Sequence, residues 1–186
     1  MKITKINLPV SSVFVSPGDT GGLAAVTPGG LFLSHDRGAT WLSSALPYSP
    51  EVIHEVAFDF QDPNLVIAAT SDGIYQSVDG GKTWTFRYGG MPKGEVTSVV
   101  FHPLHHAEAY ALHFGWVYKS VDGGAHWTVF DRSGLGNVNF RTIVFDLSGS
   151  DPQLYGLALL RGVYAYHTPL ENATKSVTAR PHGSSN

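Results

Sequence analysis

Short apolar stretches alternate with polar turns along the chain, and the pattern repeats. Runs of β-branched and aromatic residues lie at 13–15, 56–58 and 99–101, spaced by 43 residues, and a fourth run lies at 143–145. Gly, Pro, Asp and Asn separate the runs, and no segment sustains an apolar period of 3.6 residues. Because this pattern is typical of short strands joined by turns, it predicts an all-β antiparallel fold with almost no helix.

One octapeptide recurs in register with these runs. The segments SHDRGATW (34–41), SVDGGKTW (77–84) and SVDGGAHW (120–127) align without gaps, and their serines are also 43 residues apart. A third apolar run precedes each octapeptide, and a fourth strand starts at its tryptophan. A period in the low forties with four strands per unit is typical of a β-propeller of four-stranded antiparallel blades.

The repeat divides the chain into three full blades and one partial blade. We place the blades at about 13–55, 56–98, 99–141 and 142–168, within one propeller domain of residues 1–168. The last blade lacks its outer strand, and residues 2–8 form a spare strand that a closed ring could use to complete it. Residues 169–186 are rich in Ser, Thr, Gly and Pro, so we expect a flexible tail.

The octapeptides have a structural interpretation. An Asp side chain can accept hydrogen bonds from turn amides, a Gly allows a positive φ, and a Trp can cover the turn at the start of the outer strand. A catalytic Asp would not be expected in three separate equivalent turns. The structural residues of the turns are Ser34, Asp36, Gly38, Trp41, Ser77, Asp79, Gly81, Trp84, Ser120, Asp122, Gly124 and Trp127.

The octapeptides with their flanking strands, over residues 13–167, resemble the Asp-box or BNR-repeat propellers. That superfamily includes sialidases, xyloglucan-cleaving glycoside hydrolases, sortilin-type receptors and photosystem II assembly factors. The resemblance implies a propeller whose repeat turns are structural and lie away from the ligand face.

Two enzymatic alternatives follow from this resemblance. A sialidase-like site needs an arginine cluster, a tyrosine nucleophile with a glutamate and an acid/base aspartate. Residues 140–143 (FRTI) are similar to the sialidase arginine motif but lack its proline and follow the last octapeptide. A xyloglucanase-like hydrolase needs two carboxylates and generally two large propellers, so this chain would be a fragment or half of a larger secreted enzyme.

We expect the ligand face at the loops on the side opposite the repeat turns. Those loops mix aromatic, basic and amide side chains that suit a protein loop or a sugar. The candidate residues are Tyr48, His54, Arg87, Tyr88, Trp116, Asn137, Asn139 and Arg141. The sequence therefore favours a non-catalytic scaffold that binds a protein or carbohydrate, with glycoside hydrolysis as the alternative.

Composition narrows the partners and cofactors. The chain has no cysteine, and its net charge of −3 is spread without a basic stripe, so nucleic acid is not an expected partner. His102, His105 and His106 lie close in sequence, but their spacing is no ligand pattern, so we predict neither a metal nor a cofactor. No stretch is apolar enough to span a membrane or resembles an export signal; a fragment of a secreted protein would be extracellular or periplasmic. A homodimer that completes a larger ring is a further expectation.

Overall fold

The fold was determined as a computed structural model of the 186-residue chain. The structure describes residues 2–3, 6–16, 21–48, 50–130, 140–148, 150–158 and 162–166. These residues form strands, turns and bends without helix, and so hold no helix that could cross a membrane. The predicted tail at 169–186 lies outside the described residues, as do Asn137 and Asn139.

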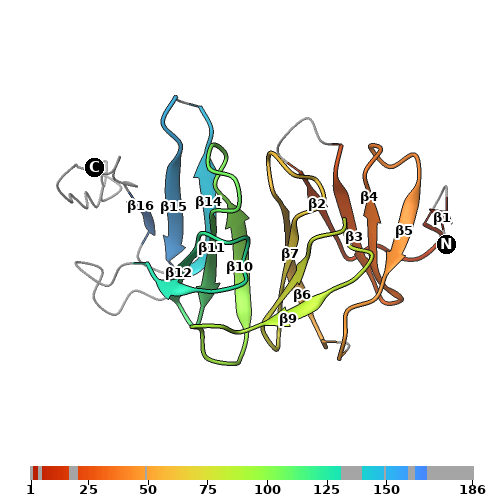
Figure 1. Ribbon diagram of the computed structural model, residues 1–186, viewed down its shortest axis with the longest axis horizontal. Coiled ribbons are helices and arrows are strands. Elements are labelled where there is room, and N and C mark those ends of the chain that lie inside the picture. Colours follow the sequence, from red (N-terminus) through yellow and green to blue (C-terminus); the bar gives the residue numbers. More distant parts are fainter. Residues whose placement is uncertain are drawn as a thin grey trace, which may run out of the picture.

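The described strands form four antiparallel sheets that follow one another along the chain (Figure 1). The first sheet contains β1 (Lys2–Ile3), β2 (Ser12–Val15), β3 (Leu23–Thr27), β4 (Gly30–Ser34) and β5 (Trp41–Ser44). The second contains β6 (Ile53–Phe58), β7 (Val66–Thr70), β8 (Ile74–Ser77) and β9 (Thr85–Arg87). The third contains β10 (Val96–Phe101), β11 (Ala109–His113), β12 (Trp116–Ser120) and β13 (Thr128–Val129). The fourth contains β14 (Phe140–Asp146), β15 (Gln153–Ala158) and β16 (Gly162–Tyr166).

The outer strand of the last unit corrects one prediction. The fourth sheet has three described strands, in the order β14-β15-β16, as the missing octapeptide predicts. The described strand within residues 2–8, β1, pairs elsewhere. Lys2 and Ile3 pair instead with Leu42 and Trp41 of β5, at the outer edge of the first sheet. The spare strand therefore joins the sheet that follows it in sequence, which closes a shorter loop than pairing with the fourth sheet would.

The sheets pack face to face through three apolar joints, one between each pair of successive sheets. The inner strands β2, β6, β10 and β14 contact one another in chain order, and the sheets extend outward from them (Figure 1). In the first joint Val56 and Phe58 of β6 pack on Leu31 and Leu33 of β4. Burial of each such side chain contributes about 1.5–3 kcal/mol, so each joint stabilises the packing of its two sheets.

The same register recurs in every sheet. Val26 pairs with Leu31, Ala69 with Ile74, Leu112 with Val117, and Leu157 with Val163. Each pair occupies the same place in its sheet. Structural equivalence can therefore be read directly from strand pairing, even in the fourth sheet, where the octapeptide is missing.

Candidate binding surface

Because successive strands run in opposite directions, their connections lie at two opposite ends of the sheets. We call these two ends the turn edge and the loop edge. The turn edge carries the repeat turns (34–41, 77–84 and 120–127) together with the loops at 59–65 and 102–108. The loop edge carries residues 45–52, 71–73, 88–95 and 114–115. Between them, the inner strands line an axial cavity that is open to solvent beside Val13, Val15 and Val144.

The repeat turns share one hydrogen-bond pattern. In the second turn, Asp79 Oδ1 accepts from the Thr83 N–H at 2.9 Å and from the Ser77 hydroxyl at 2.8 Å. Ser77 Oγ in turn accepts from the Gly81 N–H at 2.8 Å. Burial opposes ionisation of Asp79, but its donors from Thr83 and Ser77 lower its pKa to about 2.

The first and third turns repeat these bonds, with one substitution in the third. Asp36 accepts from the Thr40 N–H at 2.7 Å, and Asp122 accepts from the His126 N–H at 2.9 Å. In the third turn His126 stands where the others have threonine, and its Nδ1 lies 2.7 Å from Asp122 Oδ2. Every carboxylate is thus used within its own turn.

The turn glycines and tryptophans also hold the sheets together. Gly38, Gly81 and Gly124 all have positive φ, between 81° and 90°. Trp84 and Trp127 are buried, whereas Trp41 is only half-buried. The Trp84 indole donates to Ser44 Oγ of the preceding sheet at 2.7 Å, so a repeat turn anchors its sheet to the one before it.

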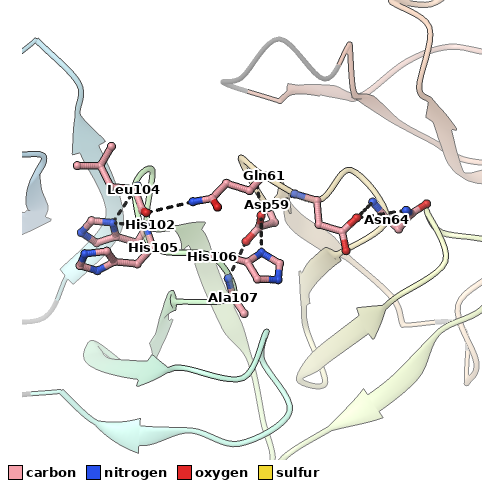
Figure 2. A network of polar contacts seen from close by, with 9 residues as sticks. Asp59, Gln61, Asn64, His102, Leu104, His105, His106 and Ala107 are labelled. Carbon is pink, nitrogen blue, oxygen red and sulfur yellow. Dashed lines mark hydrogen bonds and ion pairs between the residues drawn. The ribbon is translucent and has the colours of Figure 1, made fainter.

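A polar network on the turn edge links the second and third sheets (Figure 2). Asp59 is fully buried and accepts from the N–H groups of Gln61, Asp62 and Ala107 at 2.8, 2.9 and 2.9 Å. His106 Nδ1 lies 3.1 Å from the same carboxylate. Burial opposes ionisation of Asp59, but these donors outweigh it and lower its pKa. Sequence reasoning missed this residue, because its contacts with Ala107 and His106 of the third sheet are made only by packing.

His102, His105 and Glu108 form the one group of potential metal ligands within the part of the chain that the structure describes. The two imidazole rings stack with centroids 4.1 Å apart and planes 8° from parallel. Ring lone pairs lie in the ring planes, so two stacked rings do not point at a common ion. His102 Nδ1 accepts from the N–H groups of Leu104 and His105, and Lys119 Nζ lies 2.9 Å from Glu108. The geometry suits hydrogen bonding within this turn.

The axial cavity has a volume of about 330 Å³ and is lined mainly by apolar residues of β2, β6, β10 and β14. Glu55 is the only acidic residue among the described residues that line it. Its Oε2 accepts from the Ser98 hydroxyl at 2.7 Å and from the Val99 N–H at 2.9 Å. Burial raises the pKa of Glu55, and these two donors offset only part of that effect.

The loop edge carries a group of aromatic rings around one positive charge. Tyr48 and Tyr88 both lie against Phe86, with ring centroids 6.3 and 5.6 Å from it. Tyr48 is 82% exposed and Tyr88 is 53% exposed. Lys93 Nζ lies 5.2 Å from the centre of the Tyr88 ring. We call Tyr48, Phe86, Tyr88 and Lys93 the aromatic surface.

Of the other residues predicted for the ligand face, some lie near the loop edge and some lie elsewhere. His54 Nε2 lies 3.0 Å from Glu95 Oε1, close to the aromatic surface in sequence, and Trp116 is exposed at the β11–β12 turn. Arg87 differs, because its Nε donates to Gln76 Oε1 at 2.9 Å and so lies against the body of the second sheet. Arg141 is an exposed residue of β14. The structure therefore brings together Tyr48 and Tyr88, and adds Phe86 and Lys93, which the sequence did not single out.

Solved structures share this fold. No protein-family model matches the sequence, and no curated protein matches it. The GH74 enzyme of Niastella koreensis aligns with a TM-score of 0.65 and 21% identity, over 86% of this chain and 28% of its own. The GH74 xyloglucanase of Xanthomonas campestris aligns with a TM-score of 0.64 and 18% identity, over 95% of this chain and 32% of its own.

A third similar structure is YCF48 bound to D1 peptide, with a TM-score of 0.59 and 16% identity, over 89% of this chain and 58% of its own. The fold is a β-propeller. At these identities the likeness concerns the fold alone, and the β-propeller predicted from the repeat is confirmed. The chain spans about a quarter to three fifths of the length of these propeller proteins.

Proposed function

We propose that this propeller is a non-catalytic binding scaffold whose aromatic surface holds a glycan or an exposed segment of a protein. The observation that carries the proposal is the exposure of Tyr48 and Tyr88, which both contact the Phe86 ring. Rings of this kind offer a large contact area with little rotamer entropy to lose, which suits both sugar faces and protein side chains.

The backbone around Tyr48 supports this proposal. Tyr48 has a φ of 65°, a conformation that costs a non-glycine residue about 1–2 kcal/mol. Such strain persists only where the surrounding structure holds it, and it is common at binding sites. The loop therefore holds the Tyr48 ring outward before a ligand arrives.

The polar groups of the loop edge suit a partner with hydroxyl or carbonyl groups. Lys93 above the Tyr88 ring is a donor, and Glu95 beside His54 is an acceptor. A few directional groups around an apolar platform give orientation and specificity. Two similar propellers, a xyloglucanase and YCF48 bound to a peptide, are in keeping with these two ligand classes.

The carboxylates of the described chain support the absence of catalysis. Glycoside hydrolysis normally uses two carboxyl groups flanking one bond. The axial cavity has one among its described residues, Glu55, and the three turn aspartates are held in separate turns.

The test is calorimetric titration of the chain with xyloglucan-derived and unbranched β-glucan oligosaccharides, and with a panel of unstructured peptides. We expect one class to bind, and Tyr48→Ala and Tyr88→Ala each to weaken binding roughly tenfold, because an aromatic contact contributes about 0.5–1.5 kcal/mol beyond its area. Leu104→Ala, an exposed apolar residue of the turn edge, is the control that should leave affinity unchanged. Equal affinity of all three variants would refute the proposed surface.

A second candidate function is glycoside hydrolysis by a larger protein of which this chain is a part. The GH74 likeness and the buried carboxyl of Glu55 favour it. Turnover of xyloglucan by the chain, measured as reducing ends, would favour this second candidate. Turnover that Glu55→Gln abolishes would establish the enzymatic function and overturn the scaffold proposal.

A further inference from the structure

The first sheet exposes a face that the repeat normally buries. In the second and third sheets the equivalent inner-strand residues pack on the sheet before them: Val56 and Phe58 are 3% and 1% exposed, and Val99 and Phe101 are 0% and 2% exposed. The corresponding residues of β2 are Val13 and Val15, which are 57% and 66% exposed. We call this the leading face.

The fourth sheet exposes the opposite half of the same joint. In the third sheet the cross-strand pair Leu112 and Val117 is 0% and 3% exposed, because it packs on the fourth sheet. The pair in the same register of the fourth sheet is Leu157 and Val163, which are 47% and 54% exposed. Val144 of β14, 51% exposed, also belongs to this trailing face.

The two exposed faces therefore correspond to the two halves of one joint that the molecule already forms three times. In each internal joint, a valine or isoleucine and usually an aromatic residue of an inner strand meet the middle strands of the preceding sheet. A leading face and a trailing face from two molecules carry the same apolar positions and can form the same packing. Exposed apolar patches of this kind mark interaction sites in soluble proteins.

We propose that two copies of this chain associate head to tail, with the trailing face of each packed on the leading face of the other. The face on one copy is not self-complementary, so the contact is heterologous, and it leaves no exposed face only if the two joints close into a ring. Two copies bring together eight sheets, within the range of about four to eight blades that propellers form. This assembly is independent of the ligand of the loop edge.

Mass in solution and two variants test the assembly. Multi-angle light scattering and sedimentation velocity should give twice the chain mass of 20.0 kDa. Val15→Glu and Val163→Glu each place a charge in one face and should weaken association at least tenfold. Both residues are more than half exposed in the single chain, and circular dichroism should show an unchanged fold. Val78→Glu, at a residue 68% exposed on the turn edge, should remain a dimer.

Mixing the two variants determines the orientation. The Val15→Glu chain keeps a native trailing face and the Val163→Glu chain keeps a native leading face, so an equimolar mixture should regain association through one intact joint. A monomeric parent chain, a dimer that only one of the two variants disrupts, a mixture that stays monomeric, or a ladder of larger oligomers would each overturn the closed head-to-tail pair.

Discussion

Two buried carboxyl groups of this propeller have opposite pKa shifts because their hydrogen bonds differ. Asp59 accepts from three backbone N–H groups and also lies beside His106, and its pKa is lowered. Glu55 accepts from one hydroxyl and one N–H, and burial raises its pKa. The number of donors, rather than burial alone, decides which charge the fold tolerates.

Substitution of Glu55 should therefore change the pH dependence of stability. An acid whose pKa is raised on folding keeps its proton longer in the folded state, so the free energy of unfolding falls as pH rises above the ordinary value of 4.5. Glu55→Gln should remove this loss and make the variant relatively more stable at pH 7 than at pH 4.5. Urea denaturation at the two pH values measures the difference.

Asp59→Asn is the matched control with the opposite sign. The lowered pKa of Asp59 stabilises the fold above the ordinary value of 3.8, and that contribution is lost as pH falls through the folded pKa. We expect Asp59→Asn to cost about 1–3 kcal/mol at pH 7 and much less in acid. If both variants showed the same pH trend, the assignment of the two shifts would be wrong.

At the scale of strands and turns, Gly81 both allows its turn to form and lets the turn pack against the preceding sheet. Gly38 and Gly81 have nearly the same φ, 86° and 81°. A Cβ at Gly38 would meet Leu23 at an ordinary 3.4 Å, whereas a Cβ at Gly81 would overlap the side chain of Leu33 in the preceding sheet. The second turn is thus both a hairpin and part of a joint between sheets.

Alanine substitutions at Gly38 and Gly81 should separate the effect of backbone conformation from the effect of packing against the preceding sheet. Gly38→Ala should cost only the strain of the left-handed backbone, about 1–2 kcal/mol. Gly81→Ala should cost more, since the added methyl group also overpacks the joint by about 1–3 kcal/mol. Adding Leu33→Ala to Gly81→Ala tests the cause in a double-mutant cycle of thermal unfolding. Without a favourable coupling between the two substitutions, the extra cost would not come from Leu33.

The sequence predicted the elements better than the contacts between them. The strands, the four sheets and the turn hydrogen bonds of Asp36, Asp79 and Asp122 follow from local patterns that recur every 43 residues. The bonds of Glu55 to the third sheet and of Arg87 to Gln76 depend on how sheets and strands are stacked, which no local pattern records. The pairing of β1 with β5 was mispredicted for the same reason.

The candidate surface was predicted in part. Tyr48 and Tyr88 stand in loops whose edge follows from counting strands, so their shared location was accessible from the sequence. The role of Phe86 was not accessible, because it lies within β9 and its contacts with the rings of Tyr48 and Tyr88 depend on packing. Asn137 and Asn139 remain predictions.

For the whole molecule, the coverage of the sheets predicts a gradient of local stability. The second and third sheets are packed on both faces, whereas the first and fourth are packed on one. In repeat architectures stability depends on such neighbour contacts. Hydrogen exchange measured on the Val15→Glu chain should show the slowest amides in β7, β10 and β11 and faster ones in β2 and β16. Uniform protection across the four sheets would contradict this gradient.

The hydrogen bonds along the turn edge have a consequence for how such a molecule can diversify. His35 Nε2 lies 2.8 Å from the Gly80 carbonyl, and Gln76 donates to the Gly123 carbonyl at 2.7 Å, so the first turn is bonded to the second and the third turn is bonded to the sheet before it. A residue inserted in one of these turns would shift its hydrogen-bonding groups away from their partners in the neighbouring turn or sheet. The loops at 45–52 and 88–95 lie on the other edge, where length can vary without breaking these bonds. New specificities should therefore arise by insertion and deletion in those loops, while the turns keep a constant length.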